Sequence, residues 1–340
     1  MRRTTDDIAV NEQNKIRKIA FLGTPGFAVP SLKMLIARGY EIEVFTQPDR
    51  PKDRGHALAA PEVKLAALEA GLPVHQFERI RREEGVNALR AFAPDLMVTA
   101  AFGQLLSEEN LSIPKYGCVN VHGSLLPLYR GASPIQTAII KGEKVTGVTT
   151  MLTSLGMDEG DILLKKETEI GENETYGELY ARLAELGAEL LLETVDALEA
   201  GTLTRTAQDG TLATYCRPIK KQDAMIDFAL PTQRIHDLVR GLAPAPCAFA
   251  VLAGQNVRIL KTKPIREPSD FPKADLSAFT AAVPGECVAA SPKQGLAVKT
   301  GDGFIEIVEL QFPGGKPMAA KAALNGKKLL GCVFERPEGV

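Results

Sequence analysis

The sequence has few cysteines, and they lie far apart. There are five, with no Cys-x-x-Cys pair and no cluster of cysteine with histidine: Cys118, Cys216, Cys247, Cys287 and Cys332. Zinc sites and the disulfide frameworks of small secreted domains both rely on closely spaced cysteines. The sequence therefore predicts free, buried thiols, no disulfide framework and no metal site.

Long apolar runs are also absent. No stretch approaches the roughly 18 apolar residues that a membrane-spanning helix requires. The first residues, MRRTTDDIAV, carry acidic side chains where a signal peptide has its apolar segment. We expect a cytoplasmic protein without a membrane partner.

A glycine-rich dinucleotide fingerprint is missing as well. The first apolar run, KIAFLG, continues into TPGFA instead of G-x-G-x-x-G, and Pro25 stands where backbone amides would bind a pyrophosphate. This argues against a nicotinamide-dependent enzyme. A tight turn between a strand and a helix is enough to explain Gly23 and Gly26.

What the sequence does contain is the composition of an ordinary globular protein, with 45% hydrophobic and 24% charged residues. Its 340 residues suit two domains better than one. The charge is spread unevenly: residues 220–340 carry 16 Lys and Arg against 12 Asp and Glu, and residues 1–219 carry 24 against 30. A mildly basic C-terminal part suits a polyanionic partner.

Strands and helices alternate along the first part of the chain. The expected strands are 18–23, 41–47, 72–77, 94–103, 117–123, 146–153 and 161–170. The expected helices are 28–39, 61–71, 82–93, 133–142 and 175–201, the last with Leu179, Leu183, Leu186 and Leu190 on one face. This order predicts an α/β domain with a mostly parallel sheet that helices cover on both faces.

The pattern changes after a linker at 202–220. Short strand patterns separated by glycine-containing turns follow at 247–265, 285–291 and 295–311, and a short helix is expected at 318–326. Such spacing is typical of a small antiparallel sheet or barrel.

The segment GCVNVHGSLLPLYRGASP, residues 117–134, combines a buried strand with polar side chains. Asn120 and His122 are two residues apart, so they project from the same face where the strand ends. Ligands of open α/β sheets bind at the carboxyl ends of strands. A third group comes from TSLGMDEGDIL, where Asp158 and Asp161 lie in a glycine-flanked loop; either could reach His122, or both could simply form turns.

An Asn, a His and an Asp without an activated Ser or Cys favour direct transfer over a covalent enzyme intermediate. Ser124 lies nearby, but its surroundings lack the G-x-S-x-G elbow of an activated serine. Acyl transfer to an amine needs a hydrogen-bond donor for the developing oxyanion and a base for the proton of the amine. An amide and an imidazole can supply these two functions.

Several segments resemble one family. NVHGSLLPLYRGASPIQTAI, FLGTPGFAVPSL, VFTQPDRPKDRG and GMDEGDIL closely resemble the formyltetrahydrofolate-dependent formyltransferases, and within them the methionyl-tRNA formyltransferases. The match runs from about residue 17 to the C terminus and includes TYCRPIKKQDAMIDF. The Asn-x-His-x-Ser-Leu-Leu-Pro motif followed by an Asp is shared by the wider family, whereas the TQPDR loop and the C-terminal extension favour the branch that acts on tRNA.

The resemblance implies a fold and a reaction. After an N-terminal tail at 1–16, a Rossmann-like catalytic domain would span 17–201, followed by a linker at 202–220 and an OB-like antiparallel β-barrel that binds tRNA at 221–336. The formyl group would pass from 10-formyltetrahydrofolate to the α-amine of methionine esterified to initiator tRNA. A monomer without a metal is expected.

The resemblance also implies roles for individual residues. Asn120, His122 and Asp158 take the catalytic positions, although spacing leaves open whether His122 or Asp158 removes the proton of the amine. The folate-contacting loop would comprise Ser124, Leu125, Leu126 and Pro127. Residues expected to contact tRNA phosphates are Arg50, Lys52, Arg54, Lys220 and Lys221.

Two other functions stay open from sequence. A related enzyme could transfer formyl to a small amine, such as a glycinamide ribotide or an amino-sugar nucleotide, but it would have no use for the basic loop and barrel. A tRNA-binding module without catalysis would keep its only activity, binding, when Asn120 and His122 are replaced by alanine.

Overall fold

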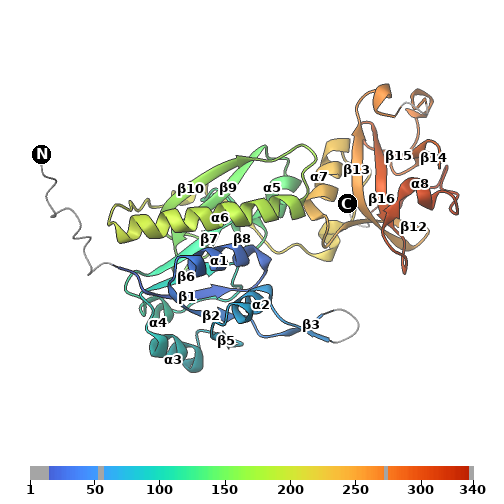
Figure 1. Cartoon of the computed structure of the whole chain (residues 1–340). Helices are drawn as coiled ribbons and strands as arrows, with labels where there is room; N and C mark the ends of the chain where they lie inside the picture. Colours follow the sequence, from blue (N-terminus) through green and yellow to red (C-terminus); the bar gives the residue numbers. More distant parts are fainter. Residues whose placement is uncertain (1–14, 53–56, 272–274, 337–340) are drawn as a thin grey trace, which may run out of the picture. The chain divides into compact units, whose positions relative to one another are not determined.

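The structure is a computed structural model that describes residues 15–52, 57–271 and 275–336 (Figure 1). The chain forms two compact units that alternate along the sequence. The first comprises the described residues within 1–131, 146–168 and 180–215, and the second comprises those within 132–145, 169–179 and 216–340.

A seven-stranded sheet is the centre of the first unit. Its strands, in spatial order, are β10 (Ile162–Glu169), β9 (Val145–Leu152), β7 (Cys118–His122), β6 (Leu96–Ala100), β1 (Lys18–Gly23), β2 (Glu41–Thr46) and β5 (Val74–Gln76). The five strands from β7 to β5 are parallel, and β9 runs antiparallel to β7. The prediction of a mostly parallel α/β sheet is therefore confirmed.

Helices lie along the strands of this sheet (Figure 1). They are α1 (Val29–Ala37), α2 (Glu62–Glu69), α3 (Glu83–Phe92), α4 (Glu108–Leu111) and α6 (Tyr176–Glu199). Leu89 and Phe92 of α3 share a buried cluster with Leu22, Met97 and Cys118 of the sheet. Burial on both faces explains why the central strands read as continuous apolar runs in the sequence.

Helix α6 packs closely against β7 and β9. A Cβ atom at Gly187 would lie 2.8 Å from Val121 and 3.4 Å from Val148, so only a glycine permits this approach. Successive side chains of a strand face opposite ways. Since Val121 faces α6, Asn120 and His122 project from the other face of β7.

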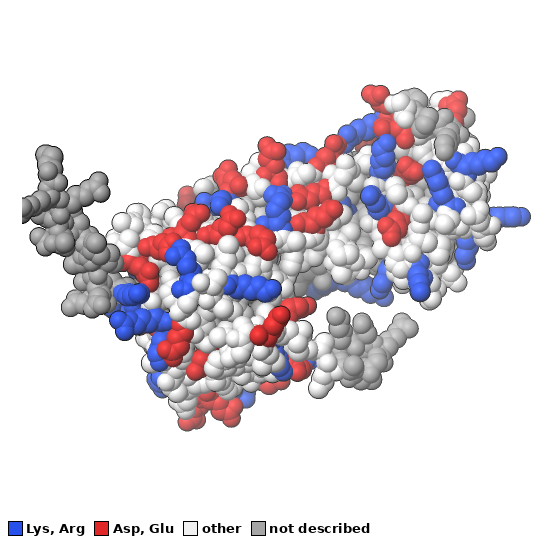
Figure 2. Space-filling view, in the orientation of Figure 1, with Lys and Arg blue, Asp and Glu red and all other residues white. Residues whose placement is uncertain are grey.

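The leucines predicted to share one face of α6 lie inward. Leu179, Leu183 and Leu190 are buried, and Leu186 is half-buried. The opposite face is acidic, with five exposed side chains that gather over this helix in Figure 2: Glu178, Glu185, Glu189, Glu193 and Asp196. Among the described residues, no helix combines the length and the apolar composition needed to cross a bilayer.

The second unit contains the predicted antiparallel sheet. Its path is β12 (Ala248–Leu252), β13 (Gln255–Ile265), β16 (Phe304–Gln311), β15 (Gly295–Lys299) and β14 (Cys287–Ser291), and β17 (Met318–Ala319) pairs with β16. Residues 333–335 bridge both edges of this sheet, since Glu335 pairs with Val251 of β12 and Val333 pairs with Glu286 next to β14. This segment joins the edge strands into a barrel-like closure.

Helix α7 (Thr232–Leu242) covers the core of this unit and was not expected from the sequence. Its Ile235, Val239 and Leu242 are buried in the core, as the helical spacing requires. Its His236, Asp237 and Arg240 are buried as well, and Arg240 Nε donates to Asp237 Oδ1 at 2.7 Å. The apolar residues of this helix repeat with helical spacing, but the prediction for this part of the chain considered strand patterns and the final short helix only.

The remaining elements are short. Helix α5 (Pro134–Ile140) belongs to the second unit, and α8 (Ala320–Ala323) is shorter than the helix expected at 318–326 because β17 occupies its first residues. In the first unit, β3 (Arg50–Lys52) and β4 (Ala57–Ala59) pair in a region expected to be a loop. All five cysteines are free, and all except Cys332 are buried, as predicted.

Candidate active site

His122 stands at the end of β7 with its ring orientation fixed. The side chain is 7% exposed, and Nε2 lies 3.1 Å from the carbonyl oxygen of Tyr129. A carbonyl oxygen only accepts hydrogen bonds, so Nε2 carries a hydrogen and donates it. In the neutral ring, the lone pair is therefore on Nδ1, which is the nitrogen available for proton transfer.

Asp158 faces that nitrogen from the loop between β9 and β10. Its Oδ2 lies 3.7 Å from His122 Nδ1 and accepts a hydrogen bond from the Gly131 amide at 2.8 Å. The 3.7 Å separation exceeds a hydrogen-bond distance, so the carboxylate acts on the ring through its charge when the ring is protonated. Asp161, the other aspartate of the loop, accepts from the Leu152 amide through its backbone carbonyl.

Asn120 lies two residues before His122 on the same face of β7. The Thr99 hydroxyl, on the adjacent strand β6, donates to Asn120 Oδ1 at 2.9 Å. The amide oxygen is therefore occupied, and the NH2 group is the end of the side chain that remains to donate. No acceptor for this NH2 group is found among the residues that the structure describes.

Cys118 is the third residue on this face of β7. Its side chain is buried, and burial raises the pKa of the thiol to about 11. A thiol with this pKa stays protonated near neutral pH and is a poor nucleophile. Cys118 therefore has the structural role predicted for it.

The segment from Ser124 to Pro127 follows β7 directly. Ser124 is 1% exposed and its hydroxyl donates to the Leu128 carbonyl at 2.6 Å, so it does not act as a free nucleophile. Leu126 is buried against Met151 and Ile162, whereas Leu125 and Pro127 are half-buried.

Neighbours of the site that the sequence did not suggest include Thr99, the Tyr129 carbonyl, Arg130 and Gln208. The last two line a cavity of about 460 Å³ beside the Asp158 loop, together with Thr153, Glu159 and Asp161. Tyr129 and Arg130 lie within the segment 117–134, whereas Thr99 and Gln208 reach the site from distant parts of the chain and no local pattern marks them.

Three of the five basic residues predicted to bind tRNA, Arg50, Lys220 and Lys221, are exposed. Arg50 is exposed at the start of β3 and pairs with Glu78 at 2.6 Å. Lys52 ends the same strand, and Arg54 lies outside the described residues. Lys220 and Lys221 are exposed near the start of the last segment of the second unit, and the face of this unit in Figure 2 presents many Lys and Arg side chains.

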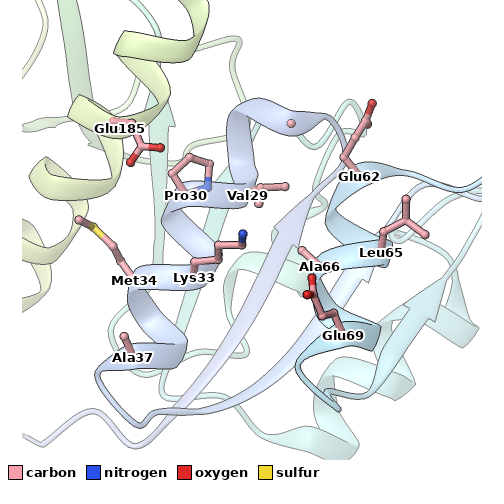
Figure 3. A pocket seen from close by; sticks show the side chains of 11 residues that line it. Val29, Pro30, Lys33, Met34, Ala37, Glu62, Leu65, Ala66, Glu69 and Glu185 are labelled. Atoms are coloured by element: carbon pink, nitrogen blue, oxygen red, sulfur yellow. The ribbon is translucent and has the colours of Figure 1, made fainter.

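A separate cavity of about 640 Å³ lies between α1, α2 and α6 (Figure 3). Its walls include Val29, Met34 and Leu65, with Lys33 and Glu69 beside them. None of the predicted site residues lines it. Within the described ranges, no cluster of three or more His, Cys, Asp and Glu side chains is arranged to hold a metal ion.

Comparison with known proteins adds family information to this geometry. The family model described as formyl transferase matches residues 17–195, and the model described as formyl transferase, C-terminal domain, matches residues 218–328. The methionyl-tRNA formyltransferase of Ruminiclostridium cellulolyticum is 48% identical over 313 residues, which are 92% of this chain and 97% of the relative. That of Acetivibrio thermocellus is 45% identical over the same shares of both chains.

A solved structure supports the fold. HypX from Aquifex aeolicus in complex with tetrahydrofolic acid is similar over 94% of this chain and 51% of that chain. The TM-score is 0.62 and the identity is 17%, so this similarity shows the fold alone.

Proposed function

The chain belongs to the formyl transferase family, with the activity of a methionyl-tRNA formyltransferase that uses formyltetrahydrofolate, and from this premise we propose that Asn120, His122 and Asp158 carry out the transfer. The observation that supports these roles best is the meeting of Asp158 Oδ2 and His122 Nδ1, 3.7 Å apart, at the strand end that also carries Asn120.

Asn120 is the oxyanion donor in this proposal. The α-amine of the methionyl group attacks the formyl carbon of the donor, a C–N bond forms, and the formyl oxygen gains negative charge. The Asn120 NH2 group is suited to donate to that oxygen, because Thr99 already occupies its amide oxygen. A fixed donor of this kind stabilises the transition state more than the ground state.

His122 accepts the proton of the attacking amine at Nδ1. Its Nε2–H is committed to the Tyr129 carbonyl, so Nδ1 is the only ring position open to the reaction. The positive charge that the ring gains is stabilised by the Asp158 carboxylate. The proton then passes to the folate nitrogen that leaves when its bond to the formyl carbon breaks.

The segment Ser124, Leu125, Leu126 and Pro127 contacts the folate in this proposal. Because the Ser124 hydroxyl is bonded to Leu128 and the Leu126 side chain is buried, these two residues would contribute backbone groups. The half-buried side chains of Leu125 and Pro127 would supply apolar contacts.

The acceptor tRNA is bound by basic side chains in both parts of the chain. In the catalytic domain, residues 17–201, we assign phosphate contacts to Arg50, Lys52 and Arg54. Two further phosphate contacts are assigned to Lys220, the last residue of the 202–220 linker, and Lys221, the first residue of the OB-like tRNA-binding domain at 221–336. Arg50 must exchange its exposed ion pair with Glu78 for a phosphate, which costs little because such pairs contribute about 1 kcal/mol or less.

We further propose that the acceptor is the initiator methionyl-tRNA, that the protein is cytoplasmic and that it is a monomer.

The decisive assay mixes the protein with 10-formyltetrahydrofolate and initiator methionyl-tRNA, with free methionine and elongator methionyl-tRNA as controls. Formylation of the initiator alone is expected. Sedimentation at several protein concentrations tests the monomer.

Substitution of the site tests the catalytic roles. Asn120→Ala and His122→Ala should each lower the single-turnover rate by about a hundredfold to ten-thousandfold, because each removes a group that acts on the reacting atoms. Binding of tRNA should persist, and Thr204→Ala, an exposed residue of the linker, should behave as wild type. Full turnover by either site variant would contradict the assignment, and unchanged binding with no turnover in the wild type would favour a binding module.

A further inference from the structure

Gln208 lies in the segment expected to be only a linker, yet it contacts the loop that carries Asp158. Its Nε2 donates to the backbone carbonyls of Asp158 at 2.9 Å and of Gly160 at 2.7 Å. One side-chain amide thus uses both of its hydrogens on one turn of the loop. The residues involved are about 50 positions apart in the chain, so the contact is a tertiary one.

Arg130 fixes the other end of the same amide. The Gln208 oxygen accepts from Arg130 Nη2 at 2.7 Å and from Arg130 Nε at 3.1 Å. Arg130 is 3% exposed, and its Nη1 lies 3.4 Å from the Tyr215 hydroxyl. The amide can therefore neither rotate nor flip without breaking bonds at both ends.

The backbone next to Arg130 holds the Asp158 carboxylate directly. Gly131 N donates to Asp158 Oδ2, the same atom that faces His122 Nδ1. The φ angle of Gly131 is 114°, a value that strains residues with a side chain. Arg130 and Gly131 therefore reach residue 158 by two routes, through Gln208 to its backbone and through the Gly131 amide to its side chain.

Asp158 needs such support because its own backbone is unusual. Its φ angle is 51°, in the left-handed region that non-glycine residues adopt rarely and that the surrounding structure has to stabilise. A rotation of this residue would swing the carboxylate away from the imidazole. Two hydrogen bonds to the carbonyls at 158 and 160 oppose that rotation.

We propose that Gln208 and Arg130 are positioning residues of the formyl transfer, which hold the 158–160 turn so that the Asp158 carboxylate stays beside His122. The inference rests on the proposed role of Asp158. The segment that follows helix α6 is then part of the active-site framework, because its Gln208 supplies the amide that holds the loop.

Two substitutions at position 208 separate positioning from general stability. Gln208→Glu keeps the length of the side chain and its pairing with Arg130 but removes both N–H donors to the loop. Gln208→Ala removes all of the bonds, and Thr204→Ala is the control in the same segment. For each variant, kcat, Tm and the Michaelis constants of both substrates, methionyl-tRNA and the formyl donor, are measured.

We expect both Gln208 variants to lower kcat by about tenfold to a hundredfold, since small displacements of a catalytic group have effects of this size. Both Michaelis constants should stay within about threefold of wild type because no substrate contact is lost. In an Asp158→Asn background, Gln208→Glu should cause no further loss in the residual rate, because the group that it positions is already inactive.

Several results would overturn the proposal. These are a Gln208→Glu enzyme with the kcat of wild type, a change confined to the Michaelis constants, or an equal fold-loss in the wild-type and Asp158→Asn backgrounds. If Gln208→Ala does not fold, Gln208→Glu decides; if neither folds, the residue is structural and the proposal is wrong. Full activity of Asp158→Asn itself would instead contradict the proposed function.

Discussion

The polar side chains proposed for catalysis in the first unit and for phosphate binding in the second are held in opposite ways. In the first, His122, Ser124 and Arg130 are buried and bonded to backbone or side-chain groups at the rim of a parallel sheet. In the second, Lys220 and Lys221 are exposed. Reaction at one carbon atom requires groups fixed to within fractions of an ångström, whereas attraction to a phosphate backbone requires charge that is accessible and tolerates movement.

This difference predicts that near-isosteric changes disable the first unit, while changes that preserve charge leave the second intact. Among these near-isosteric changes, the largest effect is expected for Asp158→Asn, which keeps the shape and the hydrogen bond from Gly131 but removes the charge facing His122. We expect the single-turnover rate to fall by about a hundredfold to a thousandfold. Rapid-quench assays at saturating substrates measure it, and a loss smaller than about threefold would break the comparison.

The next effect in size concerns the orientation of Asn120. Thr99→Val keeps the volume of the side chain but removes the hydroxyl that donates to the Asn120 oxygen. Without that bond the amide can turn its oxygen toward the developing oxyanion, so kcat should fall by about tenfold. Comparison of kcat and Tm for this variant and for Thr204→Ala checks the result. A lowered Tm with unchanged kcat would show that Thr99 only stabilises the strand.

The second unit should respond to charge alone. Replacing both Lys220 and Lys221 by alanine should weaken tRNA binding about fivefold at low salt and reduce the slope of log K against log salt concentration by about one to two. The matched variant with arginine at both positions should bind as wild type does. Filter binding at four salt concentrations measures the slopes. Equal weakening by the arginine variant would mean that geometry matters here too.

The smallest effect concerns the stability of the junction next to Lys220. A hydrogen bond from Arg217, at 2.6 Å, lowers the pKa of Asp223 to about 2. A carboxylate with a lowered pKa stabilises the fold above its unfolded pKa of about 3.9 and loses this contribution as the pH falls through about 2.

Asp223→Asn should therefore lower the free energy of unfolding at pH 7 by about 1 kcal/mol, a modest value because Arg217 is 57% exposed. The difference from wild type should shrink between about pH 4 and pH 2. Urea denaturation at pH 7 and pH 3 measures both values. A difference that grows on acidification would contradict the sign of this coupling.

The sequence predicts the sheet of the first unit well for a physical reason. Strands that are buried on both faces, such as β1 and β6, consist of consecutive apolar residues and are visible in a single sequence. Helix α7 was missed although its apolar residues repeat with helical spacing; only the burial of its polar His236, Asp237 and Arg240 depends on tertiary packing. The direction of β9 depends on tertiary packing, which no local pattern records.

The site residues likewise differ in whether a local sequence pattern reveals them. Asn120 and His122 lie two residues apart on one strand, so strand periodicity alone placed them on one face. Asp158 was a candidate from its loop and from resemblance. Thr99 and Gln208 act on residues 21 and 50 positions away, and hydrogen bonds at that separation leave no trace in composition or spacing.

The segment 333–335, which pairs with both edges of the antiparallel sheet, lies beyond the part matched by the C-terminal family model, which ends at residue 328. Within this segment, Phe334 fills the core, where its ring stacks on Phe228 with centroids 5.2 Å apart. Removal of this segment would take the Phe334 ring out of the core. It would also expose the backbone amides and carbonyls of the two edge strands. Such exposed edges attract strands of other molecules, so loss of this segment is expected to promote self-association.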